Sequence, residues 1–121
     1  IKARKGQGKF RKNLEKLEPG CRVTGVELKT LLIASHIKPW RVADNTERLD
    51  GNNGLLLAPH IDKLFDRGWI SFLENGELTC ANDEVEGVLQ QWGVNLPLNV
   101  GGFNKNQATH LQYHQDYIFK G

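Results

Sequence analysis

The chain has 121 residues, of which 39% are hydrophobic and 25% charged, and its formal net charge is +2. These values exclude a disordered chain and are typical of one globular domain with its own core. No apolar run approaches the roughly 20 residues of a membrane-spanning helix, so we expect no membrane partner. Two cysteines without a Cys-x-x-Cys pair indicate neither a zinc site nor a disulfide framework, and they favour a reducing cytoplasm.

Positive charge is concentrated at the N-terminal end, where the first twelve residues contain no acidic side chain. The basic residues there are Lys2, Arg4, Lys5, Lys9, Arg11 and Lys12. Such a cluster is either a solvated face or an arm that follows nucleic-acid phosphates, because clustered cations gain affinity through counterion release.

Hydrophobic spacing and turn residues divide the chain into helices and short strands. Apolar residues at i, i+4 and i+7 indicate helices, Pro59 suits the first position of one, and Asn75-Gly76 indicates a hairpin. The predicted helices cover residues 8–18, a stretch from Pro59 to Gly68, 83–92 and 106–119. The predicted strands are a short one after a turn at 23–25, a buried one at 31–34, another at 55–57, and the hairpin pair 69–73 and 77–80. Residues 41–52 and 99–106 predict loops.

The middle of the chain presents three motifs in a fixed order. "LLIASHIKPW" ends in His-Ile-x-Pro, "NGLLL" follows, and "LFDRG" ends the next helix. This order resembles the HNH endonucleases, or ββα-metal (His-Me finger) nucleases, and more narrowly the branch attached to restriction-type proteins. "GQGKFRKNL", "CRVTG" and "HLQYHQDYIF" are similar to that branch too. The resemblance implies an α+β fold, with a ββα-metal core flanked by terminal helices and a β-hairpin, and a metal-dependent DNA endonuclease of the restriction or defence type.

The resemblance covers most of the chain, so we expect residues 1–121 to form one nuclease domain. Its parts would be a basic helical arm at 1–20, a catalytic core at 21–80 and a C-terminal helical region at 81–121. Because the sequence begins at Ile1 without methionine, we expect the C-terminal fragment of a longer cytoplasmic protein with an N-terminal recognition domain. Whether the protein is a homodimer is left open.

The resemblance makes His36 the general base and Asn53 the residue that orients it by a hydrogen bond. Phosphodiester hydrolysis needs a base that takes a proton from water and a divalent cation that stabilises charge on the phosphate. Histidine suits the first task near neutral pH. On the residues alone, His36 could instead cap the strand and pack under Trp40. Asn53 could be a turn residue, and Asn52 competes with it for the orienting role.

The resemblance places the metal ligands at Ser35, Asp62 and Asp66. Many members carry Asp or His where this chain has Ser35, a poor ligand, so we expect the metal to be held mainly by Asp62, water and substrate phosphate. On a helix, residues 62 and 66 project about 40° apart, whereas 60 and 62 project about 160° apart. Carboxylates favour Mg²⁺, with Mn²⁺ as the alternative. Asp66 could instead pair with a neighbouring arginine.

DNA is the implied substrate, and basic residues around the core are the expected phosphate contacts. They are Lys38, Arg41, Arg48, Lys63 and Arg67. His60 lies where a helix N-terminus would favour a phosphate, or it packs against the surface. His110 and His114 have metal-ligand spacing, but their aromatic neighbours favour a packed terminal helix.

Two other functions compete with the endonuclease. A non-catalytic DNA-binding module on the same scaffold is favoured by Ser35, the weak ligand. A helical interaction domain would leave the spacing of His36, Asn53 and Asp62 unexplained.

Overall fold

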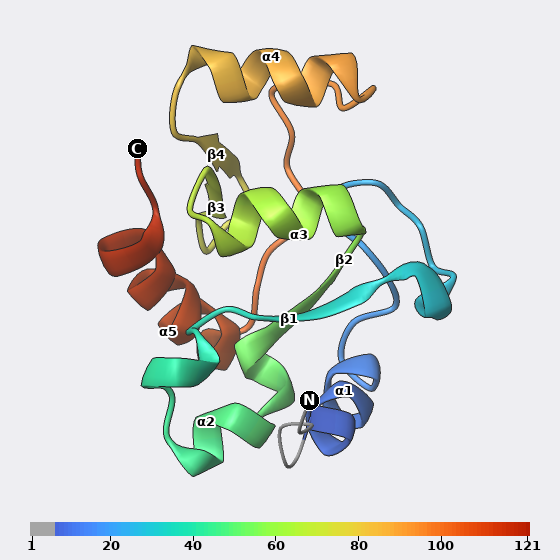
Figure 1. Cartoon of the computed structure of the whole chain (residues 1–121), viewed down its shortest axis with the longest axis vertical. Coiled ribbons are helices and arrows are strands. Elements are labelled where there is room, and N and C mark those ends of the chain that lie inside the picture. Colours follow the sequence, from blue (N-terminus) through green and yellow to red (C-terminus); the bar gives the residue numbers. More distant parts are fainter. Residues whose placement is uncertain (1–6) are drawn as a thin grey trace.

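The computed structural model describes residues 7–121 and has an α+β fold with two small antiparallel sheets (Figure 1). Its helices are α1 (Gln7–Glu15), α2 (Asn45–Leu49), α3 (Pro59–Asp66), α4 (Asp83–Gln91) and α5 (Lys105–Tyr113), which a π-helical turn, η4 (His114–Ile118), continues. Its strands are β1 (Ile33–His36), β2 (Gly54–Leu57), β3 (Ile70–Phe72) and β4 (Leu78–Cys80). Short 3₁₀ turns are η1 (Lys29–Leu31), η2 (Trp40–Val42) and η3 (Gly51–Asn53).

The centre of the molecule is a ββα unit formed by β1, β2 and α3. The strands pair antiparallel, with Ile33 opposite Leu57 and His36 opposite Gly54. Only Ala58 separates β2 from α3, whose first residue is Pro59, as predicted. Helix α3 packs on β1, and α1 contacts both β1 and β2 (Figure 1). The two-stranded sheet is therefore held between two helices that are distant in sequence.

A second layer contains the predicted β3–β4 hairpin with α4 and α5. Gly76 adopts a φ of +96° in the hairpin turn, which is the conformation that Asn-Gly turns use. Asn82 caps α4 by accepting a hydrogen bond from the backbone N–H of Val85. Helix α4 lies at the top of the view and α5 at its left-hand side (Figure 1). None of the helices within residues 7–121 is long and apolar enough to cross a membrane.

The strand predicted at residues 31–34 is displaced and less buried than expected. Strand β1 begins at Ile33 and runs on to His36, while Leu31 lies in η1 and is exposed. The reason is a side chain: the guanidinium of Arg11 donates to the backbone carbonyls of Lys29 and Leu32. These carbonyls are thereby satisfied without a partner strand. The short strand predicted after the turn at 23–25 is also absent from the described structure.

Residues 41–52 were predicted as a polar loop, and this prediction is wrong. They contain the helix α2, which a capping box starts: Asp44 accepts from the backbone N–H of Glu47, whose carboxylate accepts from the N–H of Asp44. The Asp-x-x-Glu spacing of a capping box was visible in the sequence. The loop was predicted because the polar composition of the segment was given more weight than this spacing.

A buried polar group ties the end of α1 to α5. Glu18 is almost fully buried, and its carboxylate accepts hydrogen bonds from Arg22 and from the side-chain amide of Gln107. The guanidinium of Arg22 also donates to Gly101 and lies over the ring of Phe103. Because a buried carboxylate is costly unless it is paired, this network fixes how the terminal helices meet.

The two cysteines and the two C-terminal histidines have structural environments. Both cysteines are free, and burial raises the pKa of the Cys80 thiol to about 11, so it stays protonated. His110 lies 3.5 Å from a carboxylate oxygen of Asp50. His114 stacks on Phe65, and its two ring nitrogens bond to the Ser71 hydroxyl and the Phe65 carbonyl. These contacts confirm the packed terminal helix.

We expect His114 to make the protein less stable as the pH falls. Burial lowers the pKa of His114 below its ordinary value, against a smaller opposing effect of its bond to Phe65. The folded state thus favours the neutral ring, and stability present above about pH 6.5 is lost below it. For this single group the loss cannot exceed about 1.4 kcal/mol per pH unit. Urea unfolding at a series of pH values measures it.

The control is His114→Gln, which should unfold more easily at pH 7 but with a flatter pH dependence than the unsubstituted protein. Equal pH dependence in both proteins would show that His114 titrates alike in the folded and unfolded chains.

Candidate active site

A pocket of about 370 Å³ opens beside β1 and brings five of the predicted site residues together. They are Ser35, His36, Arg41, Asp62 and Asp66. Gln7 of α1 and Trp40 also line it. The other predicted site residues lie outside this lining: Asn53 is fully buried behind it, and His60, Lys38, Arg48, Lys63 and Arg67 occupy neighbouring positions on the loop and on α3.

Three contacts with residues that the structure describes hold His36 at the end of β1. Its Nε2 lies 3.0 Å from the backbone oxygen of Arg48, which can only accept, so Nε2 carries the proton. In the neutral ring the lone pair then resides on Nδ1. The ring of Phe10 stacks on the imidazole, with centroids 3.7 Å apart and planes 13° apart. The ring of Trp40 approaches it edge-on at 5.6 Å. The imidazole therefore has a defined tautomer and a defined plane.

Asn53 cross-links the backbone of the loop that follows His36. Its side-chain oxygen accepts from the N–H of Lys38 over 2.8 Å, and its NH₂ donates to the carbonyls of Lys38 and Glu47. Its own carbonyl accepts from the N–H of Ile37. Because Glu47 precedes Arg48, this clamp also positions the carbonyl that holds His36. The side chain thus acts on the histidine through the loop.

Asn52, the competing candidate, faces another part of the molecule. Its amide donates to Asp50, and its oxygen accepts from the side chain of Asn104. This geometry favours Asn53 for the orienting role.

The two carboxylates of α3 and the serine of β1 meet at the pocket. Burial raises the pKa of the Asp62 carboxyl above its ordinary range, a hydrogen bond from Ser35 lowers it, and the charge of Asp66 raises it. Adjacent residues of a strand point to opposite faces, so Ser35 turns toward α3 while His36 turns toward α1. Ser35 is thereby placed as a partner of Asp62.

These residues fit a divalent cation bound with few protein ligands. Asp62 and Asp66 lie one helical turn apart on the same pocket, and the repulsion between their charges is what a cation would relieve. Mg²⁺ commonly uses one or two carboxylates and keeps several waters. Among residues 7–121, no group of three His, Cys, Asp or Glu side chains is placed to hold a metal.

Two of the expected phosphate contacts are engaged inside the protein. Lys38 forms an ion pair with Glu47 at 3.0 Å. Arg48 donates to the carbonyl of Trp40, and its guanidinium lies 4.6 Å above the ring of the same residue. Both side chains stabilise the loop between β1 and β2, so a phosphate would have to compete for them.

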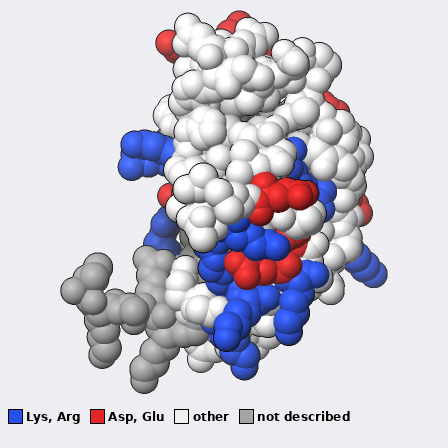
Figure 2. All heavy atoms as spheres, turned by 90° about the vertical axis from the view of Figure 1, so that its right-hand side faces the viewer, with Lys and Arg blue, Asp and Glu red and all other residues white. Residues whose placement is uncertain are grey.

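Arg41, Lys63 and Arg67 are exposed, and none of them forms an ion pair within residues 7–121. Basic side chains gather around a few carboxylates on the lower half of one face, whereas the upper part, which includes α4, shows none (Figure 2). The sequence of α4 contains no Lys or Arg. On this face the basic side chains thus lie away from α4.

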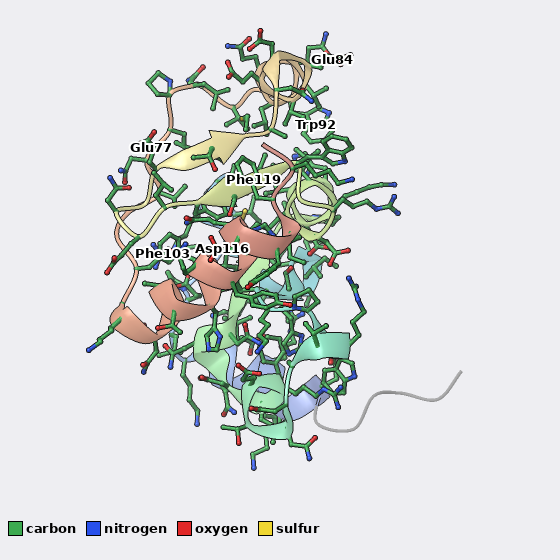
Figure 3. All side chains as sticks on the ribbon, turned by 90° about the vertical axis from the view of Figure 1, so that its left-hand side faces the viewer. Glu77, Glu84, Trp92, Phe103, Asp116 and Phe119 are labelled. Atoms are coloured by element: carbon green, nitrogen blue, oxygen red, sulfur yellow. The ribbon has the colours of Figure 1, made fainter. Side chains whose placement is uncertain are left out.

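His60 lies at the second position of α3 and packs against Trp92 at the end of α4, with ring centroids 4.7 Å apart. The indole occupies the space between α4 and α3 (Figure 3). This contact matches the packing alternative for His60. It also agrees with the helical angle that separates His60 from Asp62.

The basic arm is only partly described. Lys2, Arg4 and Lys5 lie outside the described residues. Lys9 and Lys12 are exposed on α1, whereas Arg11 is bound to Glu15 and to two backbone carbonyls. Arg11 therefore has a structural role that its position in the charge cluster concealed.

The comparison with known families agrees with this geometry. Residues 21–73 match the HNH endonuclease family. A domain of this family implies phosphodiester hydrolase activity, and an HNH nuclease implies a DNA substrate. Enzymes of this family generally use a divalent metal ion, which suits the carboxylates of α3. No curated protein gave a significant match to the chain.

Sequence reasoning missed two residues of the site. Gln7 and Phe10 lie on α1, before the segment that matches the HNH family, and Phe10 was assigned only to the apolar face of a helix. The contact between Trp40 and His36 was anticipated as the packing alternative for His36. No local signal links a helical phenylalanine to a histidine 26 positions later, since their contact depends on how α1 packs on the sheet.

We predict that Asn53→Ala destabilises the fold and impairs cleavage together. The substitution leaves the buried N–H of Lys38 and the carbonyl of Glu47 without their partners, which costs about 1–3 kcal/mol. It should lower the midpoint of urea unfolding. The matched control is Asn52→Ala, which removes more exposed bonds and should cost less. If the two variants unfold and cleave alike, the clamp assigned to Asn53 is wrong.

Proposed function

We propose that this protein is a metal-dependent DNA endonuclease of the restriction type, with His36 as general base and Asp62 as the main metal ligand. The single observation that carries the proposal is one pocket that is lined both by a tautomer-fixed histidine of β1 and by two carboxylates of α3. The free cysteines are consistent with action in the cytoplasm.

The chemistry of the pocket follows from the state of His36. With its Nε2 proton held by the Arg48 carbonyl, the neutral ring accepts a proton from water at Nδ1. The water oxygen then bonds to phosphorus, and the bond from phosphorus to the leaving oxygen breaks. The resulting imidazolium stays stacked on Phe10, and a cation over an aromatic face is stabilised by the ring quadrupole.

Asp62 and Asp66 would hold the divalent ion, preferably Mg²⁺, and Ser35 orients the first of these carboxylates. When bound, the ion stabilises negative charge on the phosphate and the leaving oxygen. Two carboxylates would repel a polyanion, so an ion between them and the phosphate also makes the site compatible with its substrate.

DNA would approach over the exposed cations beside the pocket. Arg41 lines the pocket itself, and Lys63 and Arg67 extend the positive surface along α3. Support for the restriction role comes from the segments on both sides of the core, "GQGKFRKNL" and "HLQYHQDYIF". A recognition domain in a longer protein would supply the sequence specificity.

His36→Ala and Asp62→Ala should both lose cleavage of supercoiled plasmid DNA. Loss of a positioned base lowers the rate by about 10²–10⁴-fold. Loss of Asp62 should remove the dependence on Mg²⁺ or Mn²⁺ that EDTA reveals in the unsubstituted protein. Binding of DNA should persist in His36→Ala, because phosphate contacts lie elsewhere.

His60→Ala is the matched control, since it removes a histidine from α3 outside the pocket. It should keep metal-dependent cleavage. Normal rates in His36→Ala would identify the chain as a non-catalytic DNA-binding module, and full metal dependence in Asp62→Ala would move the ion elsewhere.

The basic arm yields a separate prediction about binding. If Lys9 and Lys12 contact phosphates, replacing both with alanine should weaken binding of all DNA sequences alike. The slope of log affinity against log salt should become less steep by roughly 0.9 for each phosphate contact that is lost, and at most two contacts are lost. Fluorescence anisotropy with a labelled duplex measures this slope. Lys105→Ala on α5 is the control, and a slope unchanged by the double substitution would exclude the role.

A further inference from the structure

Helix α1 lies before the segment that matches the HNH family, yet among the described residues it supplies the closest ring contact of His36, the proposed base. The Phe10 ring is fully buried and lies nearly parallel to the His36 imidazole, with centroids 3.7 Å apart. A stack at this distance covers one face of the imidazole. Nothing in the HNH domain itself covers that face in the same way.

The stack supplies a restraint that the other contacts lack. A hydrogen bond from Nε2 to the Arg48 carbonyl fixes one atom of the ring, about which the plane could still turn. The edge of Trp40 lies further away, at 5.6 Å. A parallel ring against the imidazole fixes the plane itself, and with it the direction of the Nδ1 lone pair.

The loop around Asn53 is shaped to receive α1. A Cβ atom at Gly54 would lie 2.5 Å from Cζ of Phe10, and one at Gly51 would lie 2.7 Å from the backbone of Asn13. The side chain of Asn13 also donates to the carbonyl of Leu49 over 2.8 Å. Both glycines are thus required by the approach of α1. Gly54 faces His36 across the β1–β2 pair.

One helical turn before Phe10, Gln7 lines the same pocket. Its side-chain oxygen is buried and has no hydrogen-bond partner among the described residues. A buried hydrogen-bond acceptor without a partner costs folding free energy, so its presence in a native structure calls for an explanation. Gln7 therefore lines the pocket, and Phe10, one turn later on α1, stacks on the His36 ring that also lines it.

From these contacts we propose that α1 forms a wall of the active site and that Phe10 is a positioning residue for His36. The proposal rests on the proposed function, in which His36 is the base. Phe10 acts by holding the imidazole in the plane from which it accepts the proton, so its loss should affect turnover more than substrate binding.

The test compares Phe10→Leu with Phe72→Leu, which makes the same change at an equally buried phenylalanine of β3. Plasmid cleavage is measured with the whole chain in Mg²⁺, below the melting temperatures of all proteins. Phe10→Leu should lose about 10-fold or more in kcat, with KM within about twofold of the unsubstituted value. Phe72→Leu should keep its kcat. Phe10→Met serves if Phe10→Leu does not fold.

A spectroscopic readout is independent of the cleavage rates. In the unsubstituted protein, the ring current of Phe10 should move the carbon-bound proton resonances of His36 upfield of free imidazole, and Phe10→Leu should remove this shift. Unshifted His36 protons in the folded protein would overturn the proposal. So would equal kcat in Phe10→Leu and Phe72→Leu while His36→Ala loses at least 100-fold. Full activity in His36→Ala would instead refute the proposed function.

Discussion

The site depends on the clamp that Asn53 makes across the loop between β1 and β2. Each strand has only four residues, so the pairing of the strands alone gives little restraint to the long connection between them. The buried amide supplies it by bonding to the backbone at Lys38 and Glu47. Once these points are fixed, the carbonyl of Arg48 reaches His36 and selects its tautomer. A buried amide with its partners satisfied is rigid, because releasing it would leave several polar groups unpaired at once.

The electrostatic design of the site explains why Ser35 is compatible with a nuclease. A third carboxylate or a histidine at this position would bind a cation more strongly, but a serine can donate a hydrogen bond to Asp62. That bond favours the ionised carboxylate against the burial and the neighbouring Asp66, both of which disfavour it. In the proposed site, Ser35 therefore supports the carboxylate of Asp62 without being a strong ligand itself. The ion would complete its coordination with water and phosphate, as hard cations do in phosphoryl-transfer sites.

The sequence was informative where local chemistry decides structure. Pro59 at a helix start and Asn75-Gly76 in a hairpin depend on neighbouring residues alone, and both were predicted correctly. The helical angles also predicted that His60 and Asp62 project in different directions. In the structure His60 packs against Trp92, whereas Asp62 lines the pocket. Strand β1 was misplaced because Arg11, 18 positions before Lys29, satisfies the carbonyls that a strand would have used. The contact of Arg48 with Trp40 could not be predicted from the sequence either, because it forms only when the loop between β1 and β2 folds.

The contacts of α1 show that the segment that matches the family is shorter than the part of the chain that forms the site. The match to the HNH family begins at Cys21, but strand β1, inside that match, would expose one face of His36 without Phe10. Gly54 shows the same dependence from the other side, because a position that accepts no side chain is explained only by the ring packed against it. Gly54, next to Asn53, is thus explained by a helix that lies some forty residues earlier in the chain. The buried Glu18, paired with Arg22 and Gln107, then links that helix to α5. The catalytic geometry is consequently a property of the packed chain, and the short motif from His36 to Gly68 holds only part of it.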